Sequence, residues 1–357
     1  MSDISHHLVE AVKNAYESSM PLKIVAGNTK HFLGRATDTS QELSVKQHSG
    51  VTSYQPVELV LTARAGTTIS EIESVLAEHN QMLSFEPPSF SGEATLGGTL
   101  AANLSGPTRP WAGSVRDMVL GVQLINGMGE LLNYGGQVMK NVAGYDLSRT
   151  QAGAMGGLGV MTQISLKVLP KPEMQATLAL AISEAQAITL MNKLAGTAKP
   201  IVSACWHLGE LYIRLAGAAK SVSQSTKQWT SEYGFTELED STPFWHSLTQ
   251  YQYQSLLTDK PLWRFSIKST AASLALSDST LIDWAGAQRW VSGDFDPAQL
   301  QALATAAKGS VALWRGGDRS GEVNFPLPIA MQQLQQRLKR SMDPKNILNP
   351  GRLYSWL

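Results

Sequence analysis

The residues of this chain that could do chemistry are mainly glycines, gathered in two places. The stretch from Ala94 to Pro170 is rich in glycine and is interrupted by apolar runs typical of strands. Glycines at this density let a backbone approach a large flat molecule without interference from side chains. A shorter loop at residues 27–34, Gly-Asn-Thr-Lys-His-Phe-Leu-Gly, offers backbone N–H groups and a lysine, which suit a phosphate group. Together the two segments indicate a bound dinucleotide cofactor.

Two common nucleotide-binding motifs are absent from these segments. A Walker A loop requires Gly-x-x-x-x-Gly-Lys-Ser/Thr, which residues 27–34 do not supply. A Rossmann fingerprint requires Gly-x-Gly-x-x-Gly, but Gly127-Met-Gly129 continues as Glu-Leu-Leu. Both of the corresponding nucleotide folds are therefore disfavoured.

The elements that must position the glycines form a small α+β unit followed by a β-rich region. Thr68-Ile-Ser-Glu71 is a capping-box pattern that predicts the start of a helix. Residues 118–125 and 130–134 flank a turn and predict a β-hairpin. Further strands are expected at residues 22–26, 57–63, 82–85 and 164–168.

The pattern changes near Pro172, where we place a domain boundary. Beyond it the sequence predicts strands at residues 176–182, 200–207 and 210–215, and helices at residues 183–195 and 218–233. A similar succession recurs over residues 262–315, with a helix opening at Asp296-Pro297. The two halves favour an antiparallel sheet covered by helices on one side, followed by a helix at residues 328–342.

Composition excludes several classes of function. The chain has 357 residues, of which 43% are hydrophobic, so it can bury a large core. Its 29 Lys and Arg balance 29 Asp and Glu, which argues against nucleic acid or an anionic membrane as the main partner. The single Cys205 excludes an internal disulfide, a thiolate-bound iron–sulfur cluster and a Cys-based zinc site. The N-terminus has no signal-peptide pattern and no run of 18 apolar residues occurs, so a cytoplasmic location is expected.

Five motifs in order resemble the FAD-binding domain of the vanillyl-alcohol oxidase and p-cresol methylhydroxylase superfamily. They are Ala26-Gly-Asn-Thr-Lys-His31, Thr95-Leu-Gly-Gly98, Gly113-Ser-Val-Arg-Asp-Met-Val-Leu-Gly121, Lys140-Asn-Val-Ala-Gly-Tyr-Asp146 and Gly153 through Val160. One branch of this superfamily, the glycolate and D-lactate dehydrogenases, has a closing segment that resembles Met342-Asp-Pro-Lys-Asn-Ile-Leu-Asn-Pro-Gly351. Residues 283–290 narrow the resemblance further within this branch. The resemblance implies an α+β fold with a two-part FAD-binding domain, residues 1–171. It also implies a short antiparallel-sheet cap, residues 172–327, and a C-terminal helix and tail, residues 328–357, that pack back on the FAD-binding domain.

The resemblance also implies which residues bind FAD. The first Gly-rich loop would donate to the pyrophosphate through Gly27, Asn28, Thr29, Lys30 and His31. A second loop would close over it with Thr95, Gly97 and Gly98. The ribityl chain and flavin ring would lie against Pro88, Ser105, Gly106, Gly113 and Asp117, and the adenosine half near Gly144, Asp146, Gly159 and Val160. Residues 153–159 lack two hydroxyls that relatives carry, which would alter affinity while keeping the backbone path.

Covalent attachment of the flavin occurs in several members of this superfamily, through a histidine or a cysteine. His31 lies beside the pyrophosphate loop and is the natural candidate here, although a solvated loop histidine explains it better. Cys205 is expected in a buried strand of the cap. We therefore predict dissociable FAD.

Catalytic residues are harder to place. Oxidation of a 2-hydroxy acid needs a base, a cation for the carboxylate and flavin N5 near the C2 hydrogen. Relatives carry a His-x-Gly-Asp-Gly-Asn-x-His stretch that binds a metal and the substrate, and this chain lacks it. Its seven histidines show no metal-ligand spacing, so no metal site is expected. Arg264, Arg289 and Arg315, on predicted cap strands, are the candidates for a carboxylate anchor.

Three functions stay open at this stage. In the first, the chain is the FAD-binding subunit of a glycolate-oxidising complex and relays electrons or supports assembly. A longer flavin subunit with the histidine motif would oxidise glycolate, and an iron–sulfur subunit would take the electrons. In the second, the chain is a self-sufficient dehydrogenase of small 2-hydroxy acids such as D-lactate. In the third, it is a non-catalytic scaffold. Membrane contact would come only through partners.

Overall fold

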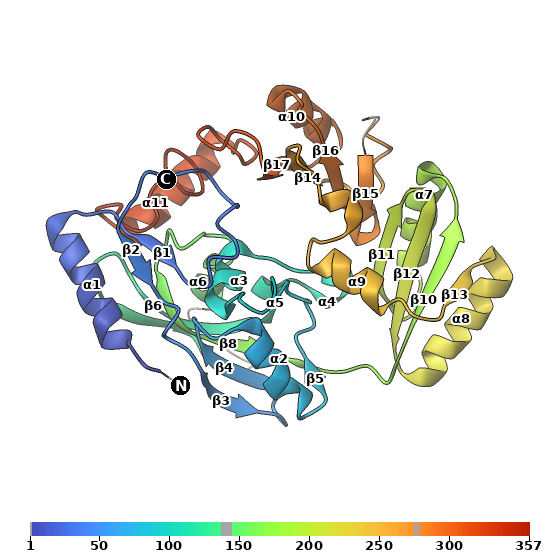
Figure 1. Ribbon diagram of the computed structural model, residues 1–357, viewed down its shortest axis with the longest axis horizontal. Helices are drawn as coiled ribbons and strands as arrows, with labels where there is room; N and C mark the ends of the chain where they lie inside the picture. The colour runs from blue at the N-terminus through green and yellow to red at the C-terminus, as the bar shows by residue number, and fades with distance from the viewer. Residues whose placement is uncertain (1, 137–144, 275, 277–278) are drawn as a thin grey trace. The chain divides into compact units, whose positions relative to one another are not determined.

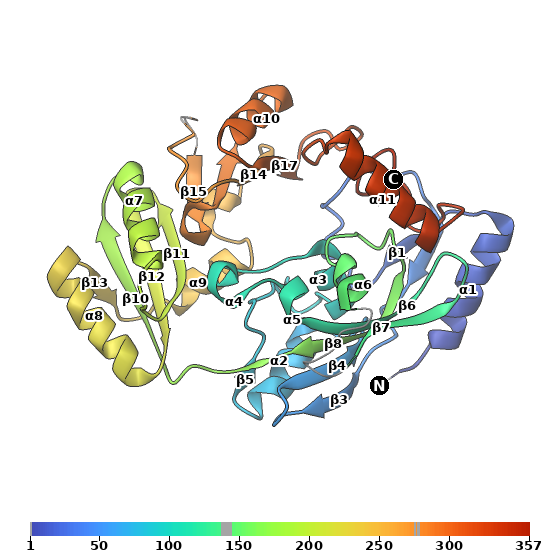
Figure 2. The same ribbon diagram turned by 180° about the vertical axis from the view of Figure 1, so that it is seen from behind.

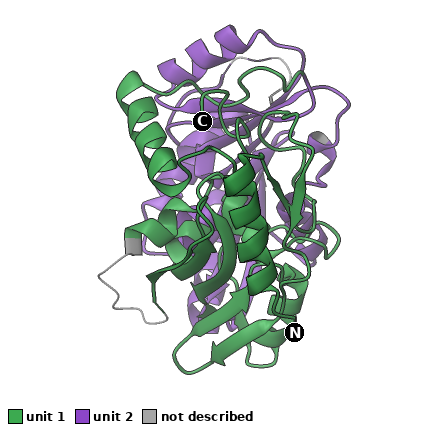
Figure 3. Cartoon of the chain, turned by 90° about the vertical axis from the view of Figure 1, so that its left-hand side faces the viewer, with its two compact units in different colours: residues 1–104, 114–170, 318–357 green, residues 105–113, 171–317 purple. Residues whose placement is uncertain are grey.

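The computed structural model describes residues 2–136, 145–274, 276 and 279–357, and the chain divides into two compact units (Figure 3). Unit 1 comprises residues 1–104, 114–170 and 318–357, and unit 2 comprises residues 105–113 and 171–317. The predicted boundaries placed residues 105–113 with the FAD-binding domain and residues 318–327 with the cap, whereas the compact units group these two segments the other way. Unit 1 is thus assembled from three stretches of chain.

A five-stranded antiparallel sheet forms the centre of unit 1 (Figure 1). In spatial order its strands are β3 (Val51–Gln55), β4 (Val60–Arg64), β8 (Val160–Lys167), β6 (Val119–Ile125) and β7 (Leu131–Gly135). Apolar side chains of β4, β6 and β8 share one core with helices α2 (Ile69–Ala77), α3 (Leu96–Ala102) and α5 (Val115–Met118). The predicted capping residue Thr68 begins α2, because its side chain accepts a hydrogen bond from the Glu71 N–H at 3.1 Å.

Residues from both ends of the chain share a second core of unit 1. Helix α1 (Ser5–Ser18) and the parallel strands β1 (Lys23–Val25) and β2 (Glu42–Ser44) lie beside the C-terminal helix α11 (Ile329–Met342), as the two opposite views agree (Figure 1 and Figure 2). Leu8 and Val12 of α1 are buried in this core with Ile347 and Leu348, and Leu348 bridges Leu22 in parallel register. The segment after α11 therefore holds the strand that leads into residues 27–31.

The remaining elements of unit 1 are short. Strand β5 (Gln81–Met82) pairs antiparallel with β9 (Leu169–Pro170). Helix α6 (Tyr145–Thr150) begins at the end of the motif at residues 140–146. The predicted strand at residues 82–85 is thus shorter than expected, because residues 166–168, which would face residues 83–85, bind β4 and Leu59 instead. The strand predicted from Val57 begins only at Val60, since residues 56–59 turn and Leu59 has a φ of 55°.

Unit 2 contains one eight-stranded antiparallel sheet. In spatial order its strands are β13 (Thr236–Leu238), β10 (Met174–Ala181), β12 (Glu210–Gly217), β11 (Ile201–His207), β15 (Ser279–Asp283), β16 (Gln288–Ser292), β14 (Leu262–Ser266) and β17 (Ser310–Arg315). Its helices are α4 (Arg109–Ala112), α7 (Glu184–Ala195), α8 (Ala219–Tyr233), α9 (Thr242–Thr249) and α10 (Pro297–Ala306), with 3-10 turns η1 (Gln254–Leu256) and η2 (Trp284–Gly286). The predictions of an antiparallel cap sheet and of an α+β fold are confirmed.

Candidate functional site

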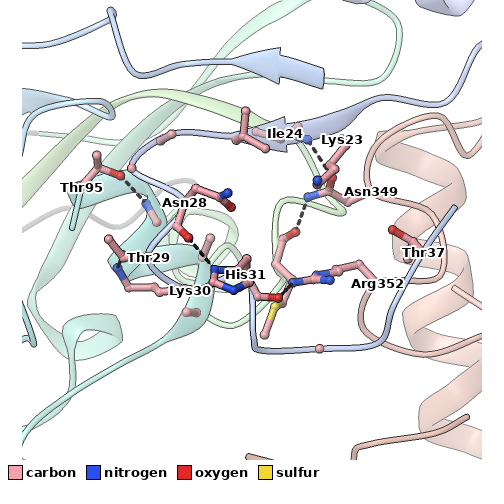
Figure 4. A pocket seen from close by; sticks show the side chains of 18 of the residues that line it. Lys23, Ile24, Asn28, Thr29, Lys30, His31, Thr37, Thr95, Asn349 and Arg352 are labelled. Atoms are coloured by element: carbon pink, nitrogen blue, oxygen red, sulfur yellow. Dashed lines mark hydrogen bonds between the residues drawn. The ribbon is translucent and has the colours of Figure 1, made fainter. Parts of the chain in front are cut away.

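A cavity of about 380 Å³ in unit 1 is the candidate site (Figure 4). Its wall is made by β1 and residues 27–31, by the first turn and one face of α3, by Met155, and by Arg319, Asn349 and Arg352 of the last forty residues. The predicted residues Gly27, Asn28, Thr29, Lys30, His31, Thr95 and Gly98 all line it. The structure therefore brings together the two motifs that sequence analysis placed at a pyrophosphate.

The backbone of residues 27–31 is fixed by close contacts. A Cβ at Gly27 would lie 1.9 Å from the carbonyl oxygen of Glu93, so no larger residue fits at this position. Asn28 has a left-handed φ of 52°, which Asn tolerates better than most residues. His31 Nδ1 lies 3.0 Å from the Asn28 carbonyl oxygen and closes the turn (Figure 4). The exposed His31 ring thus supports the loop on which it sits.

Gly97 and Gly98 lie in the first turn of helix α3, not in a loop as predicted. Thr95 begins this helix as its N-cap, and its hydroxyl accepts a hydrogen bond from the Gly98 N–H at 3.2 Å. A Cβ at Gly97 would lie 2.9 Å from the Cβ of Ala65, so this glycine permits tight packing on the neighbouring chain. Gly98 faces the cavity, because a Cβ there would approach Lys30 Nζ to 3.8 Å.

The cavity is lined by cations and by no carboxylate among its described residues. Lys23, Lys30, Arg319 and Arg352 line it, and Lys23 pairs with Glu42 at 2.9 Å. Burial lowers the pKa of Lys30 to about 8, and its Nζ lies 5.1 Å from the ring centroid of Phe90. Burial, and then the charge of Arg352, lower the pKa of Arg319 to about 10. Such a site favours an anion.

Sequence analysis did not identify three of the residues that line this cavity. Asn349 accepts a hydrogen bond from the Ile24 N–H at 2.8 Å and donates to the Met155 carbonyl at 2.6 Å. Arg352 and Arg319 donate to backbone carbonyls of residues 31–35. The Asn-Pro-Gly signature in the closing segment was the available signal, but it predicted only that this segment returns to the FAD-binding domain.

Other predicted site residues do not line this cavity. Pro88 is buried elsewhere in unit 1, and Asp146 is exposed in the first turn of α6. A Cβ at Gly159 would lie 2.7 Å from Leu124, and Val160 is buried in the core of α1 and β1. Gly144 lies outside the described residues.

The residues predicted around the flavin ring are divided between the units. Ser105, Gly106 and Gly113 belong to unit 2, where Ser105 and Gly106 line a small cavity with Asp283. Asp117 belongs to unit 1 and accepts hydrogen bonds from the N–H and hydroxyl of Ser114, each at 2.8 Å. Partial burial raises the pKa of Asp117, but these hydrogen bonds and the charges of Arg149 and Arg116 together outweigh it, so the net pKa is lowered. Asp117 thus has a local capping role for α5.

The three candidate arginines of unit 2 lie in different surroundings. Arg289 is fully buried and donates to the carbonyls of Ala271, Ala272 and Gly286, so it holds backbone. Arg315 donates to the Leu256 carbonyl. The Arg264 guanidinium lies 4.5 Å from the ring centroid of Trp314, and no described residue accepts a hydrogen bond from its buried Nε.

Comparison with known proteins defines the class. Residues 5–135 match a family model described as an FAD binding domain. The structure of p-cresol methylhydroxylase with substrate bound covers 99% of this chain and 87% of its own, with a TM-score of 0.73 at 15% identity. An alkyldihydroxyacetonephosphate synthase covers 97% of this chain and 75% of its own, with a TM-score of 0.68 at 14% identity. The chain has the fold of the p-cresol methylhydroxylase type of FAD-binding protein, as the resemblance predicted.

Sequence relatives narrow the class further. Glycolate oxidase subunit GlcE of Escherichia coli K12 is 41% identical over 355 residues, which are 99% of each chain. Glycolate oxidase subunit GlcD of Bacillus subtilis 168 is 34% identical over 119 residues, 33% of this chain and 25% of that protein. This chain belongs to the GlcE family of glycolate oxidase subunits. None of the helices in the described part of the chain has the length and apolar character that a membrane crossing requires.

Proposed function

We propose that the cavity of unit 1 binds the diphosphate of FAD without a covalent link. The observation that carries this proposal is the positive charge of the cavity. Lys30, Arg319 and Arg352 line it, and its described lining contains no acidic residue. Gly27 lets the loop pack against the Glu93 carbonyl, and Gly98 faces the cavity without a side chain. The match of residues 5–135 to an FAD-binding domain agrees with this location.

Each part of the site would have a distinct role toward the cofactor. The Lys30 ammonium would neutralise diphosphate charge, and backbone N–H groups of residues 27–31 would donate to its oxygens. FAD would supply the hydride acceptor, which no amino-acid side chain provides. The protein's own contribution is to hold the cofactor and to offset the charge of its diphosphate.

As its role in the cell, we propose the FAD-binding subunit of a multi-subunit glycolate oxidase, which passes electrons onward or supports assembly. Support comes from the 41% identity to GlcE over the whole chain, together with the absence from the sequence of the histidine-rich stretch that would bind a metal and substrate. The partners would be a longer flavin subunit and an iron–sulfur subunit. The complex would lie in the cytoplasm, with membrane contact only through partners.

One observation favours a second candidate, a self-sufficient dehydrogenase of small 2-hydroxy acids. Of the three candidate arginines, Arg264 alone has a buried guanidinium nitrogen for which no described residue is an acceptor, and an aromatic face supports its charge. A small carboxylate would satisfy that donor. Arg289 and Arg315 are less suited, since their recorded hydrogen bonds go to backbone carbonyls.

The visible spectrum of the purified, FAD-loaded chain under anaerobic glycolate separates these functions. An oxidised flavin band that persists until partner subunits are added supports the relay or assembly role. Loss of the band with the chain alone supports the dehydrogenase, and Arg264→Met should then abolish it while Arg340→Ala, on the exposed face of α11, should not. No flavin band after loading would contradict both functions and support a scaffold.

A further inference from the structure

Residues 31–36, which directly follow the candidate pyrophosphate loop, are bound to the C-terminal part of unit 1. The Arg35 N–H donates to the Arg352 carbonyl and the Ala36 N–H to the Arg319 carbonyl, each at 2.9 Å. The Arg35 side chain in turn donates to the carbonyls of Gly321 and Gly351, both at 2.9 Å. The two chain segments therefore fix one another's backbone conformation.

Two arginines extend this contact to the loop itself. The Arg352 guanidinium binds two carbonyl groups. Its Nη1 donates to the Arg35 carbonyl at 2.7 Å. Its Nη2 donates to the carbonyl of His31, which lies beside it, at 2.6 Å (Figure 4). Arg319 Nε donates to the Gly34 carbonyl at 2.8 Å. Both side chains line the cavity, so their guanidinium charge lies at its wall. An anion in the cavity would offset the repulsion between the two guanidinium groups.

Asn349 connects the same C-terminal segment to the opposite wall of the cavity. Its amide links the Ile24 N–H in β1 to the Met155 carbonyl in the turn before β8 (Figure 4). A Cβ at Gly156 would lie 2.7 Å from the Asn349 amide nitrogen, so that turn is shaped to receive it. The C-terminal segment that contains Asn349 and Arg352 thus binds three parts of the cavity wall, which are β1, the turn at Met155 and residues 27–31.

We propose that Arg319, Asn349 and Arg352 form a C-terminal clamp that positions residues 27–34 around the diphosphate, so that FAD binding and docking of residues 343–357 stabilise one another. The clamp rests on the proposed FAD site. Arg319 and Arg352 add positive charge to the cavity wall, and as members of the clamp all three residues act as positioning residues through the backbone they hold. Because the coupling is reciprocal, loss of the clamp weakens FAD binding, and FAD protects the C-terminal segment.

The first test is FAD titration of wild type, Arg352→Ala and Arg352→Lys, with Arg340→Ala, a change at an exposed arginine of the preceding helix α11, as the control. Arg352→Ala is expected to bind FAD about tenfold more weakly, because part of the binding energy must then order the loop. Lysine cannot reach both carbonyls and should restore little affinity, whereas added guanidinium at millimolar concentration should restore it in Arg352→Ala and sodium chloride should not. Arg340→Ala should bind as wild type does.

The second test is amide hydrogen exchange of residues 343–357 with and without FAD. FAD should slow exchange there in wild type, and in Arg352→Ala at saturating FAD the protection should be lost. Equal affinity in wild type and Arg352→Ala, or exchange that FAD does not change, would overturn the clamp while leaving the FAD site intact. A wild-type chain that cannot bind FAD would overturn the proposed site and the clamp together. If Arg352→Ala does not fold, Arg352→Lys decides by the same two measurements.

Discussion

The lowered pKa of Lys30 leads to a quantitative prediction for cofactor binding. Burial lowers this pKa from 10.5 to about 8, and a diphosphate beside the ammonium group would raise it again. The protonated form is the one that attracts the diphosphate. FAD affinity is therefore expected to be constant below pH 8, to fall as pH rises above 8, and to level off above the pKa of the bound state.

The loss of FAD affinity depends on how far the pH lies above the pKa of Lys30 in the free protein, which is about 8. Affinity falls tenfold per pH unit in this window, so between pH 7 and pH 9.5 it should fall roughly 30-fold, or about 2 kcal/mol. Calorimetric titration of FAD across this range measures it directly. The other cavity-lining residues with ionisable side chains are Lys23, His31, Arg319 and Arg352.

Two variants show whether Lys30 causes the slope. Lys30→Met should bind weakly at every pH and lose the dependence above pH 8, whereas His31→Gln, a change in an exposed side chain of the same loop, should keep it. A wild-type affinity that is flat between pH 7 and pH 9.5 would refute the assignment of Lys30 to the diphosphate. So would a Lys30→Met protein with an unchanged slope.

Three further predictions concern packing around the site. Gly27→Ala should abolish FAD binding measured by flavin fluorescence, because its Cβ meets the Glu93 carbonyl, while Gly196→Ala, with no atom closer than 3.5 Å, should bind normally. Asp343→Asn should lower the free energy of unfolding by about 3–5 kcal/mol in urea, since it breaks a buried ion pair with Lys339, whose atoms lie 2.8 Å apart; an unchanged midpoint would contradict this. Arg289→Met should lower the melting temperature of the protein and leave its FAD dissociation constant unchanged, because Arg289 holds backbone in unit 2.

Much of the fold could be predicted because its signals are local. The hairpin of β6 and β7 follows from two apolar runs around Asn126-Gly-Met-Gly129, and α2 follows from the Thr68 cap. Helix α3 was missed because two adjacent glycines lower helix propensity, and here tertiary packing against Ala65 outweighs it. The strand β2 was missed because three residues carry too little periodicity.

The candidate site was predicted unevenly for a similar reason. Residues 27–31, Thr95 and Gly98 belong to contiguous motifs, and the structure places them at one cavity. Arg319 and Arg352 carry no local signal, because an arginine that binds a distant carbonyl looks like any surface arginine in a sequence. Gly159 and Gly97 were predicted beside the cofactor but are needed for close packing. The sequence alone does not distinguish a glycine required for packing from one required beside a ligand.

The pairing of Leu22 with Leu348 sets the order of events during synthesis on the ribosome. At about 5–20 residues per second, some 325 residues separate the emergence of β1 from that of its C-terminal neighbours, a delay of roughly 16–65 s. Throughout that interval unit 2 can be completed, but the apolar side chains of α1 and β1 lack part of their core. During that interval these side chains are exposed to contact with other proteins, and the FAD site is complete only once residues 349–352 have emerged.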